Sequence, residues 1–307
     1  MTIDLIVLEA DRAADDVVAL RLARPDGADL PGWTPGAHID LHLGQDLVRQ
    51  YSLCGDPAET AAYRIAVLAT PDSRGGSKAV HNLRPGDHVR VSEPRNHFPF
   101  EPADHYLFVA GGIGITPLLP MIKAAEAAGA TWELAYGGRR RSSMAFLKTL
   151  QLYGPRLHVV AQEEAGLLNL NEVLAGYRPG ARIYACGPEP LLAALEERCA
   201  GLPLHLERFT AATVDTSGDT EFEVVLDRSG RTLTVPPGRS IFEVVREAGV
   251  NVLGSCLEGI CGTCETEVLD GAVDHRDTVL SAEEREADEC MMICVSRSRS
   301  TRLTLDL

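Results

Sequence analysis

The sequence is short of basic residues and contains no hydrophobic run long enough to cross a membrane. Its 307 residues include 29 Lys and Arg against 44 Asp and Glu, which gives a formal net charge of −15 at pH 7. Because so acidic a chain repels phosphate backbones, we expect no nucleic-acid partner. The longest uncharged apolar run, from Tyr106 to Ile122, is interrupted by glycines and prolines. It is too short for a comfortable transmembrane helix, so we expect no membrane anchor.

The chain also lacks an N-terminal apolar signal region, internal repeats, low-complexity tracts and any evident Ser/His/Asp arrangement. These features predict a cytoplasmic protein, in which the eight cysteines stay reduced instead of forming disulfides. The length predicts two or three domains, and we expect a monomer. The acid is concentrated at the C-terminal end, where residues 222–307 hold 16 Asp and Glu against 9 Lys and Arg.

Four of the cysteines stand in a pattern that predicts a metal centre. Cys256, Cys261 and Cys264 form Cys-x4-Cys-x2-Cys, and Cys294 follows after 29 further residues. This is the spacing of a plant-type [2Fe-2S] cluster, with three thiolates from one loop and the fourth from a distant segment. Four cysteines also suit a tetrahedral zinc ion, but structural zinc sites usually pair two short Cys-x2–4-Cys units. The spacing therefore favours iron and sulfur, with a zinc-stabilised binding module as the alternative.

The rest of the chain divides by pattern into three further segments. Residues 1–101 contain short strands separated by Pro-Gly turns, which predicts an antiparallel β-barrel, with a helix near residues 76–83. Residues 102–210 alternate strands with helices, including a helix over 143–151, and this predicts a doubly wound α/β domain with a parallel sheet. Residues 211–221 are small and polar and predict a linker.

Residues 222–307 predict an α+β domain around the cysteine loop. A hairpin is expected over 222–235, and Ser240 with Glu243, like Ser281 with Glu284, has the spacing of a capping box at the start of a helix. A strand over 291–295 is expected to carry Cys294.

The stretch Arg49-Gln50-Tyr51-Ser52-Leu53 lies in a predicted barrel strand. Strand alternation places Arg49, Tyr51 and Leu53 on one face and Ser52 on the other. An arginine, an aromatic ring and a hydroxyl together suit the phosphate, ring and N5 edge of a flavin. The pentapeptide alone is weak evidence, because most such stretches are ordinary strand residues.

A second motif, Arg74-Gly75-Gly76-Ser77, precedes a predicted helix. A glycine turn at a helix start presents free N–H groups that bind phosphate. An ordinary helix start explains this stretch equally well.

Two more motifs fall at the carboxyl edge of the predicted parallel sheet, where such sheets bind dinucleotides. Gly111-Gly112-Ile113-Gly114-Ile115-Thr116-Pro117 follows one strand, although it is not a G-x-G-x-x-G fingerprint. Cys186-Gly187-Pro188 follows another. A cysteine there is usually a small core residue, and the alternative is a thiol beside a nicotinamide.

Taken together and in this order, these motifs resemble the phthalate dioxygenase reductase-type family over essentially the whole chain. In that family a ferredoxin–NADP reductase-like flavin and nicotinamide module is fused to a C-terminal plant-type ferredoxin of the β-grasp fold. The resemblance also rests on Asp274-His275-Arg276-Asp277 and Cys294-Val295-Ser296-Arg297.

The resemblance implies a role for each site residue. Arg49 and Ser77 would hold the FMN phosphate, and Tyr51 and Ser52 would flank the flavin ring, with Ser52 near N5. Gly112, Gly114 and Thr116 would contact the nicotinamide nucleotide, and Cys186 would lie beside its reactive carbon, which makes Ser52 and Cys186 the catalytic residues. The remaining cofactor-binding residues implied are Leu53, Gly75, Gly76, Gly187 and Phe209.

The implied function is transfer of electrons from NADH through FMN and the [2Fe-2S] cluster to a separate Rieske-type oxygenase. Gly138-Arg139-Arg140-Arg141-Ser142 follows the second strand of the nucleotide domain, where arginines also suit the 2′-phosphate of NADPH. We expect NADH, with NADPH as the alternative donor. A diiron monooxygenase or a cytochrome P450 is the alternative acceptor. Leu257, Glu258 and Ile260, between the cluster ligands, are expected nearest the acceptor.

Overall fold

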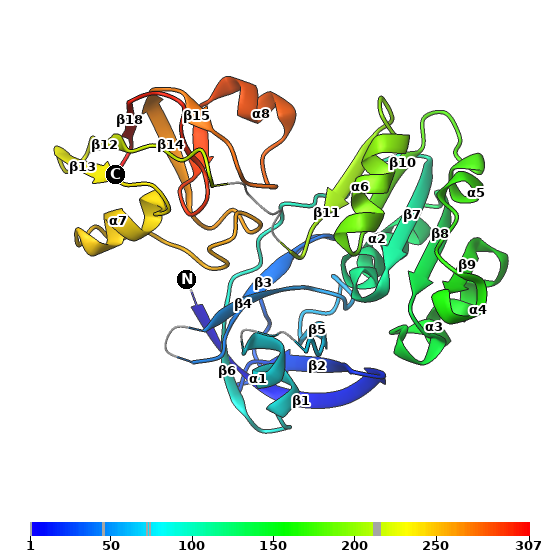
Figure 1. Ribbon diagram of the computed structural model, residues 1–307. Coiled ribbons are helices and arrows are strands. Elements are labelled where there is room, and N and C mark those ends of the chain that lie inside the picture. The colour runs from blue at the N-terminus through cyan, green and yellow to red at the C-terminus, as the bar shows by residue number, and fades with distance from the viewer. Residues whose placement is uncertain (1, 45–46, 72, 74, 211–215) are drawn as a thin grey trace. The chain divides into compact units, whose positions relative to one another are not determined.

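The computed structural model describes residues 2–44, 47–71, 73, 75–210 and 216–307. The chain forms two compact units, Met1–Phe209 and Thr210–Leu307 (Figure 1). The first unit contains both of the sheets predicted for residues 1–210. Among the described helices, none has the length and apolar character needed to cross a membrane.

An antiparallel sheet opens the first unit, with strand order β4-β3-β6-β1-β2-β5. Its apolar side chains alternate along the strands and form a buried core that includes Leu5, Leu20, Ile39 and Ile65. The end strands β4 and β5 also contact each other, so the sheet curls into the predicted barrel. The strands are β1 (Thr2–Ala14), β2 (Val17–Ala23), β3 (His38–His42), β4 (Val48–Ser52), β5 (Tyr63–Leu68) and β6 (His88–Ser92), with helix α1 (Gly76–Asn82) between the last two.

A parallel sheet follows, with strand order β11-β10-β7-β8-β9 and every neighbouring pair parallel. Its central strand β7 is apolar and almost completely buried, as expected for a strand covered on both faces. The strands are β7 (His105–Gly111), β8 (Thr131–Gly138), β9 (Leu157–Ala161), β10 (Arg182–Cys186) and β11 (Leu204–Glu207). The longer helices are α2 (Ile115–Ala127), α5 (Leu170–Ala175) and α6 (Glu189–Arg198), and the short ones are η1 (Gly112–Gly114), η2 (Arg141–Ser143), α3 (Leu147–Leu150), η3 (Gln151–Arg156) and α4 (Gln162–Ala165).

The single helix predicted for residues 143–151 is wrong. The segment is broken into η2, α3 and η3 because Phe146 adopts a left-handed backbone conformation with φ of 61°. Continuing the helix through this residue would require right-handed dihedral angles. The next break comes at Gly154, with φ of 60°, followed by Pro155.

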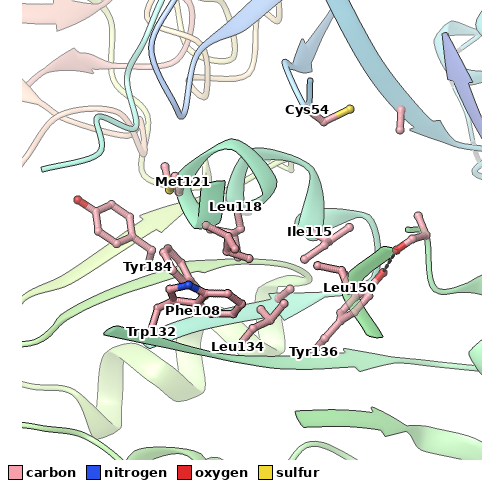
Figure 2. Close-up of a cluster of buried hydrophobic side chains, with 14 of the residues drawn as sticks. Cys54, Phe108, Ile115, Leu118, Met121, Trp132, Leu134, Tyr136, Leu150 and Tyr184 are labelled. Carbon is pink, nitrogen blue, oxygen red and sulfur yellow. Dashed lines mark hydrogen bonds between the residues drawn. The ribbon is translucent and has the colours of Figure 1, made fainter. Parts of the chain in front are cut away.

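The two sheets of the first unit share one hydrophobic core. Cys54, which follows β4, belongs to the same buried cluster as Leu118 and Met121 of α2 and Phe108 of β7. Figure 2 shows α2 between Cys54 and the aromatic side chains of the parallel sheet, and it shows the Tyr136 hydroxyl bonded to the Ala145 carbonyl. This shared core explains why the barrel and the parallel sheet form one compact unit.

The second unit is an α+β fold with strand order β13-β12-β18-β14-β16. Strands β12 and β18 are parallel neighbours, although they stand at opposite ends of the unit's sequence. The elements are β12 (Phe222–Leu226), β13 (Arg231–Val235), α7 (Ile241–Glu247), β14 (Glu265–Asp270), β15 (Val273–Asp274), α8 (Ala282–Ala287), β16 (Cys290–Met292), β17 (Arg297–Ser298) and β18 (Arg302–Leu305).

Both predicted capping boxes are present in the second unit, at the starts of α7 and α8. The predicted strand over 291–295 is shorter than expected and ends at Met292. The N–H groups of Val295 and Ser296 both donate to the Met292 carbonyl, which turns the chain. Cys294 therefore lies in a turn, not in a strand, and this brings it back toward the cysteine loop.

Candidate functional site

The last residue of β4 meets the last residue of β11. The Ser52 hydroxyl donates a hydrogen bond of 3.3 Å to a carboxylate oxygen of Glu207. Ser52 is buried, and it lies opposite His38 in the antiparallel ladder, on the face of the sheet away from the barrel core. The contact therefore joins the predicted flavin edge of the barrel to the carboxyl edge of the parallel sheet.

Cys186 is the neighbour of Glu207 in the parallel pairing of β10 with β11. Its thiol is completely buried, and burial together with the nearby Glu207 charge raises the pKa of Cys186 well above its usual value. Burial raises the pKa of Glu207 to about 8, against the lowering effect of the Ser52 hydrogen bond. Cys186 is therefore a neutral thiol at pH 7, and Glu207 is a carboxyl group that holds a proton over much of the neutral range.

Glu207 was not among the residues singled out from the sequence. The available signal was a carboxylate at the carboxyl end of the final strand of a parallel sheet, where binding residues collect. That signal is weak because many surface acids end strands. Only the spatial approach of Ser52 and Cys186 distinguishes Glu207 from them.

The glycine turn after β7 packs directly against the turn after β10. A β-carbon built on Gly114 would lie 2.2 Å from the carbonyl oxygen of Cys186, and one built on Gly111 would lie 2.5 Å from Pro188. Gly112 has φ of 56° with open space around it. The Thr116 hydroxyl donates to the Ile113 carbonyl at 2.9 Å, so it closes its own turn. The two motifs predicted to bind the nucleotide thus pack closely together, because only glycine at positions 111 and 114 leaves room for that contact.

Arg49 lies across the start of α1. A β-carbon built on Gly76 would lie 2.5 Å from Cγ of Arg49, so only glycine leaves room for that side chain. Gly75 has φ of 96°, and Ser77 is buried with its hydroxyl near the backbone N–H and the hydroxyl of Thr70. A guanidinium, a buried hydroxyl and a glycine turn in one place fit a phosphate. Arg74, the first residue of this motif, lies outside the described residues.

The remaining predicted flavin residues differ in their surroundings. Tyr51 packs against the barrel core, and its burial raises its pKa to about 12. The Leu53 side chain is completely buried in the same core, so only its backbone is placed to meet a ligand. Phe209, two residues after Glu207, is a large apolar side chain that is 37% exposed.

The arginine turn after β8 is matched by an acid from the segment after β9. The Arg141 side chain donates from Nε to both carboxylate oxygens of Glu164, each at 3.0 Å. The backbone N–H of Glu163 also donates to the Arg139 carbonyl. An acid and a base therefore stand together at this edge of the parallel sheet, near the glycine turn that follows β7.

The four predicted cluster ligands come together in the second unit. The Cys256 thiol interacts with those of Cys261 and Cys294, and the Cys264 thiol interacts with that of Cys294. The neighbouring thiols of Cys261 and Cys294, with the Glu258 N–H that donates to its sulfur at 3.3 Å, lower the pKa of Cys256, while the same interactions raise the pKa of Cys261 and of Cys294. Three thiols from one loop and a fourth from a distant turn, gathered in one place, are the donor set of a cluster held by four cysteines.

The loop between the ligands needs its unusual backbone. Gly259 and Gly262 have φ of 71° and 69°, and a β-carbon on Gly259 would lie 2.5 Å from the Val295 side chain. Leu257 also adopts a left-handed conformation, with φ of 56°, and its side chain is 47% exposed. Such strain in a non-glycine residue is typical of functional loops. Leu257 is one of the residues that the sequence analysis expects nearest the acceptor, and its side chain is both apolar and exposed.

Two known families match parts of this chain, one in each unit. The family described as "2Fe-2S iron-sulfur cluster binding domain" matches residues 224–299. The family described as "Dimethylamine monooxygenase subunit DmmA-like, N-terminal domain" matches residues 95–202. The first match supports iron and sulfur over zinc at the four cysteines, so the zinc alternative is set aside.

Known proteins match along the whole chain. The phenoxybenzoate dioxygenase subunit beta of Ectopseudomonas oleovorans is 45% identical over 96% of this chain and 94% of its own. The crystal structure of phthalate dioxygenase reductase is 35% identical, with a TM-score of 0.74, and the match covers 100% of this chain and 98% of that one. An intact type IV self-sufficient cytochrome P450 monooxygenase is 42% identical with a TM-score of 0.93, and this chain spans 41% of its length.

Proposed function

The chain belongs to the phthalate dioxygenase reductase-type family, and from this premise we propose that it passes electrons from NADH through FMN and a [2Fe-2S] cluster to a Rieske-type oxygenase. Its class is that of an NAD(P)H-dependent flavin iron–sulfur reductase serving an oxygenase. The preferred coenzyme and the type of oxygenase are the proposed parts.

The meeting of Ser52, Glu207 and Cys186 carries the proposal. A hydroxyl from the end of β4 and a neutral thiol from the end of β10 meet there around one partly buried carboxyl group. A hydride moves between two rings only when they are held close together and water is excluded. When bound, FMN supplies the chemistry that accepts the hydride and passes electrons on singly.

Each residue has a role that its surroundings support. Ser52 would present its hydroxyl to the flavin edge, and Glu207, which accepts the hydrogen bond of that hydroxyl, would orient it and hold a proton next to it. Cys186, completely buried and with no charge of its own, would form part of the wall of the nicotinamide site without attacking the ring. Arg49 and Ser77 bind the phosphate of FMN. The glycine surface formed by Gly114 and Gly187 admits the nucleotide close to the backbone.

The ion pair of Arg141 with Glu164 favours NADH over NADPH. NADPH carries a 2′-phosphate on the adenosine ribose. Because the Arg141 guanidinium is already paired with the Glu164 carboxylate, it binds that phosphate less strongly. The carboxylate itself repels that phosphate. The positive charge of Arg139, Arg140 and Arg141, which suggested NADPH as the alternative donor, is therefore partly neutralised where the ribose would lie.

A Rieske-type acceptor is favoured over a P450 by the lengths of the matching proteins. The phenoxybenzoate dioxygenase subunit and phthalate dioxygenase reductase match over nearly their whole chains, and both names refer to dioxygenases. The P450 monooxygenase shares only part of its length with this chain. We therefore place a dioxygenase-type component after the cluster.

The decisive experiment mixes the purified holoprotein with a purified Rieske oxygenase under anaerobic conditions. Addition of NADH should bleach the flavin absorption and then produce the electron paramagnetic resonance signal of the reduced Rieske centre. The same assay with a P450 and with a diiron monooxygenase measures the alternatives. Faster reduction of either one would reject the Rieske proposal, and a higher kcat/KM for NADPH would reject NADH.

A further inference from the structure

A buried acid, Asp277, packs against the loop that carries three of the four cluster ligands. Its side chain is completely buried. A β-carbon built on Gly259 would lie 3.1 Å from Cα of Asp277 and 3.3 Å from its Cβ. The N–H of the next residue, Thr278, donates to the Gly259 carbonyl at 2.9 Å. Gly259 stands between Cys256 and Cys261, so Asp277 and Thr278 are in direct contact with the ligand loop.

One oxygen of the Asp277 carboxylate holds the segment that leads into α8. It accepts the N–H groups of Val279 and Leu280 at 3.0 and 2.9 Å. These two residues precede Ser281, which caps α8. Arg285 of α8 donates to the backbone carbonyl of Asp277 at 2.7 Å. The carboxylate therefore fixes the turn between the ligand loop and the helix.

The other oxygen of Asp277 faces the turn that holds the fourth ligand. The Ser296 hydroxyl donates to it in a long hydrogen bond of 3.4 Å, and Ser296 is completely buried. Ser296 lies two residues after Cys294, and its N–H closes the turn by donating to the Met292 carbonyl at 3.0 Å. Nδ1 of His275 lies 3.7 Å from the same carboxylate oxygen. Asp277 therefore joins the three-cysteine loop to the turn of the fourth cysteine.

The two ends of the three-cysteine loop are held in different ways. At the Cys264 end, β14 pairs with β16, and the Ile293 N–H donates to the Cys264 carbonyl at 3.4 Å. Cys256 and Cys261 stand in the described stretch between α7 and β14, which forms neither helix nor strand. No strand pairing fixes this stretch against the turn of the fourth ligand. At this end, the contacts of Asp277 join the loop to that turn.

The surroundings of the Asp277 carboxylate suit its ionised form. Two backbone N–H groups and a hydroxyl donate to it, and the Arg285 guanidinium lies 3.9 Å from one of its oxygens. Reduction adds an electron to a cluster that four thiolates already make negative, and net charge is one of the factors that set its potential. A buried negative charge against the ligand loop raises the energy of the reduced form, because the protein interior screens charges weakly.

We propose that Asp277 is a positioning residue for the [2Fe-2S] cluster, which joins the loop of Cys256 and Cys261 to the turn of Cys294 and lowers the reduction potential of the cluster through its charge. All the contacts that carry this proposal lie within the second unit. It rests on the cluster of the proposed electron path and not on the identity of the coenzyme or the acceptor.

The test is Asp277→Asn in the full holoprotein, which removes the charge and nearly keeps the shape of the side chain. The reduction potential of the cluster is measured by titration with dithionite and redox mediators, followed by electron paramagnetic resonance. It should rise to give an equilibrium constant for reduction about tenfold larger, or ~59 mV for one electron. Loss of the cluster's visible absorption to an iron chelator should become about tenfold faster, as is typical when a group that supports the ligands is removed.

Two further variants keep the result decisive. Glu283→Gln is the matched control, because it removes an exposed acid at the start of α8 and should change neither quantity. If Asp277→Asn does not fold, Ser296→Ala breaks the contact with the turn of Cys294 from the other side and should also speed cluster loss. A wild-type potential or a wild-type rate of cluster loss in folded Asp277→Asn would overturn the proposal, as would equal changes in Glu283→Gln or a wild-type rate in Ser296→Ala. Neither NADH nor an oxygenase takes part, so the outcome is independent of the proposed coenzyme and acceptor.

Discussion

The hydroxyl of Ser52 donates to the carboxylate of Glu207 at 3.3 Å, across 155 residues of sequence. One residue ends a strand of the antiparallel sheet, and the other ends the edge strand of the parallel sheet. The contact is only possible because the two sheets share one core. Glu207 is partly buried there, and this is the physical reason its pKa is raised to about 8.

Replacing Glu207 by Gln should change the pH dependence of flavin reduction by NADH. In the wild-type protein the carboxyl group loses its proton as the pH passes about 8, so the rate should show a limb near that pH. Gln keeps a polar group beside Ser52 but cannot ionise, so the limb should disappear. Stopped-flow absorbance between pH 6 and 10 measures it. An unaltered limb in the variant would assign the titration to another group.

The same variant should alter stability in a pH-dependent way. Glu207 has a folded pKa of about 8 against an ordinary value of 4.5, so the folded state binds the extra proton between these values. Wild-type stability should therefore fall as the pH rises through this range, by at most ~1.4 kcal/mol per pH unit, which is the limit for a difference of one bound proton. Above pH 8 the fall should stop. Urea unfolding of Glu207→Gln should lack this slope, and an identical slope in both proteins would contradict the assignment.

Short-range features of this chain could be predicted well, and contacts between distant segments could not. The hairpin of β12 and β13 and both capping boxes follow from alternation and from residues three positions apart. The fold of three parts agrees with that predicted. The pairing of β12 with β18 depends on packing between opposite ends of the unit, and β18 itself was not predicted.

The candidate site shows the same limit. Spacing alone identified the four cysteines, because the ligands of a cluster must lie at set intervals along one loop. Glu207 was missed because its importance comes from Ser52 and Cys186, which are close to it only in three dimensions. The broken helix at Phe146 was missed because a left-handed phenylalanine has no local sequence signal.

Gly114→Ala should destabilise the first unit and weaken nucleotide binding. The new β-carbon would lie 2.2 Å from a backbone carbonyl oxygen, and backbone cannot move aside as a flexible side chain can. A loss of about 2 kcal/mol or more in the free energy of unfolding is expected from such overpacking. Gly32→Ala is the matched control, because no atom lies within 4 Å of its added carbon. Equal stability of the two variants in urea would mean that the two turns do not pack as described.

Glu164→Gln should shift coenzyme preference toward NADPH. The change releases Arg141 from its carboxylate partner and removes one negative charge from the edge of the sheet. Both side chains are nearly half exposed, so the effect should be modest, about fivefold in the ratio of kcat/KM values, or ~1 kcal/mol. Glu163→Gln is the control, because it removes the adjacent acid and leaves the Arg141 contact intact. If both variants shift the ratio equally, net charge and not the ion pair decides the preference.

Cys261→Ser should separate the two halves of the electron path. Cys261 is buried in the loop, and its sulfur lies 3.2 Å from the Thr263 hydroxyl, so a serine fits the space but is a poor ligand for iron. The visible absorption of the cluster should be lost or strongly weakened, while NADH should still reduce the flavin and, through it, ferricyanide. Cys290→Ser is the control, because this cysteine lies in β16 outside the ligand set. Loss of flavin reduction in a folded Cys261→Ser protein would show that the two units do not act as separable carriers.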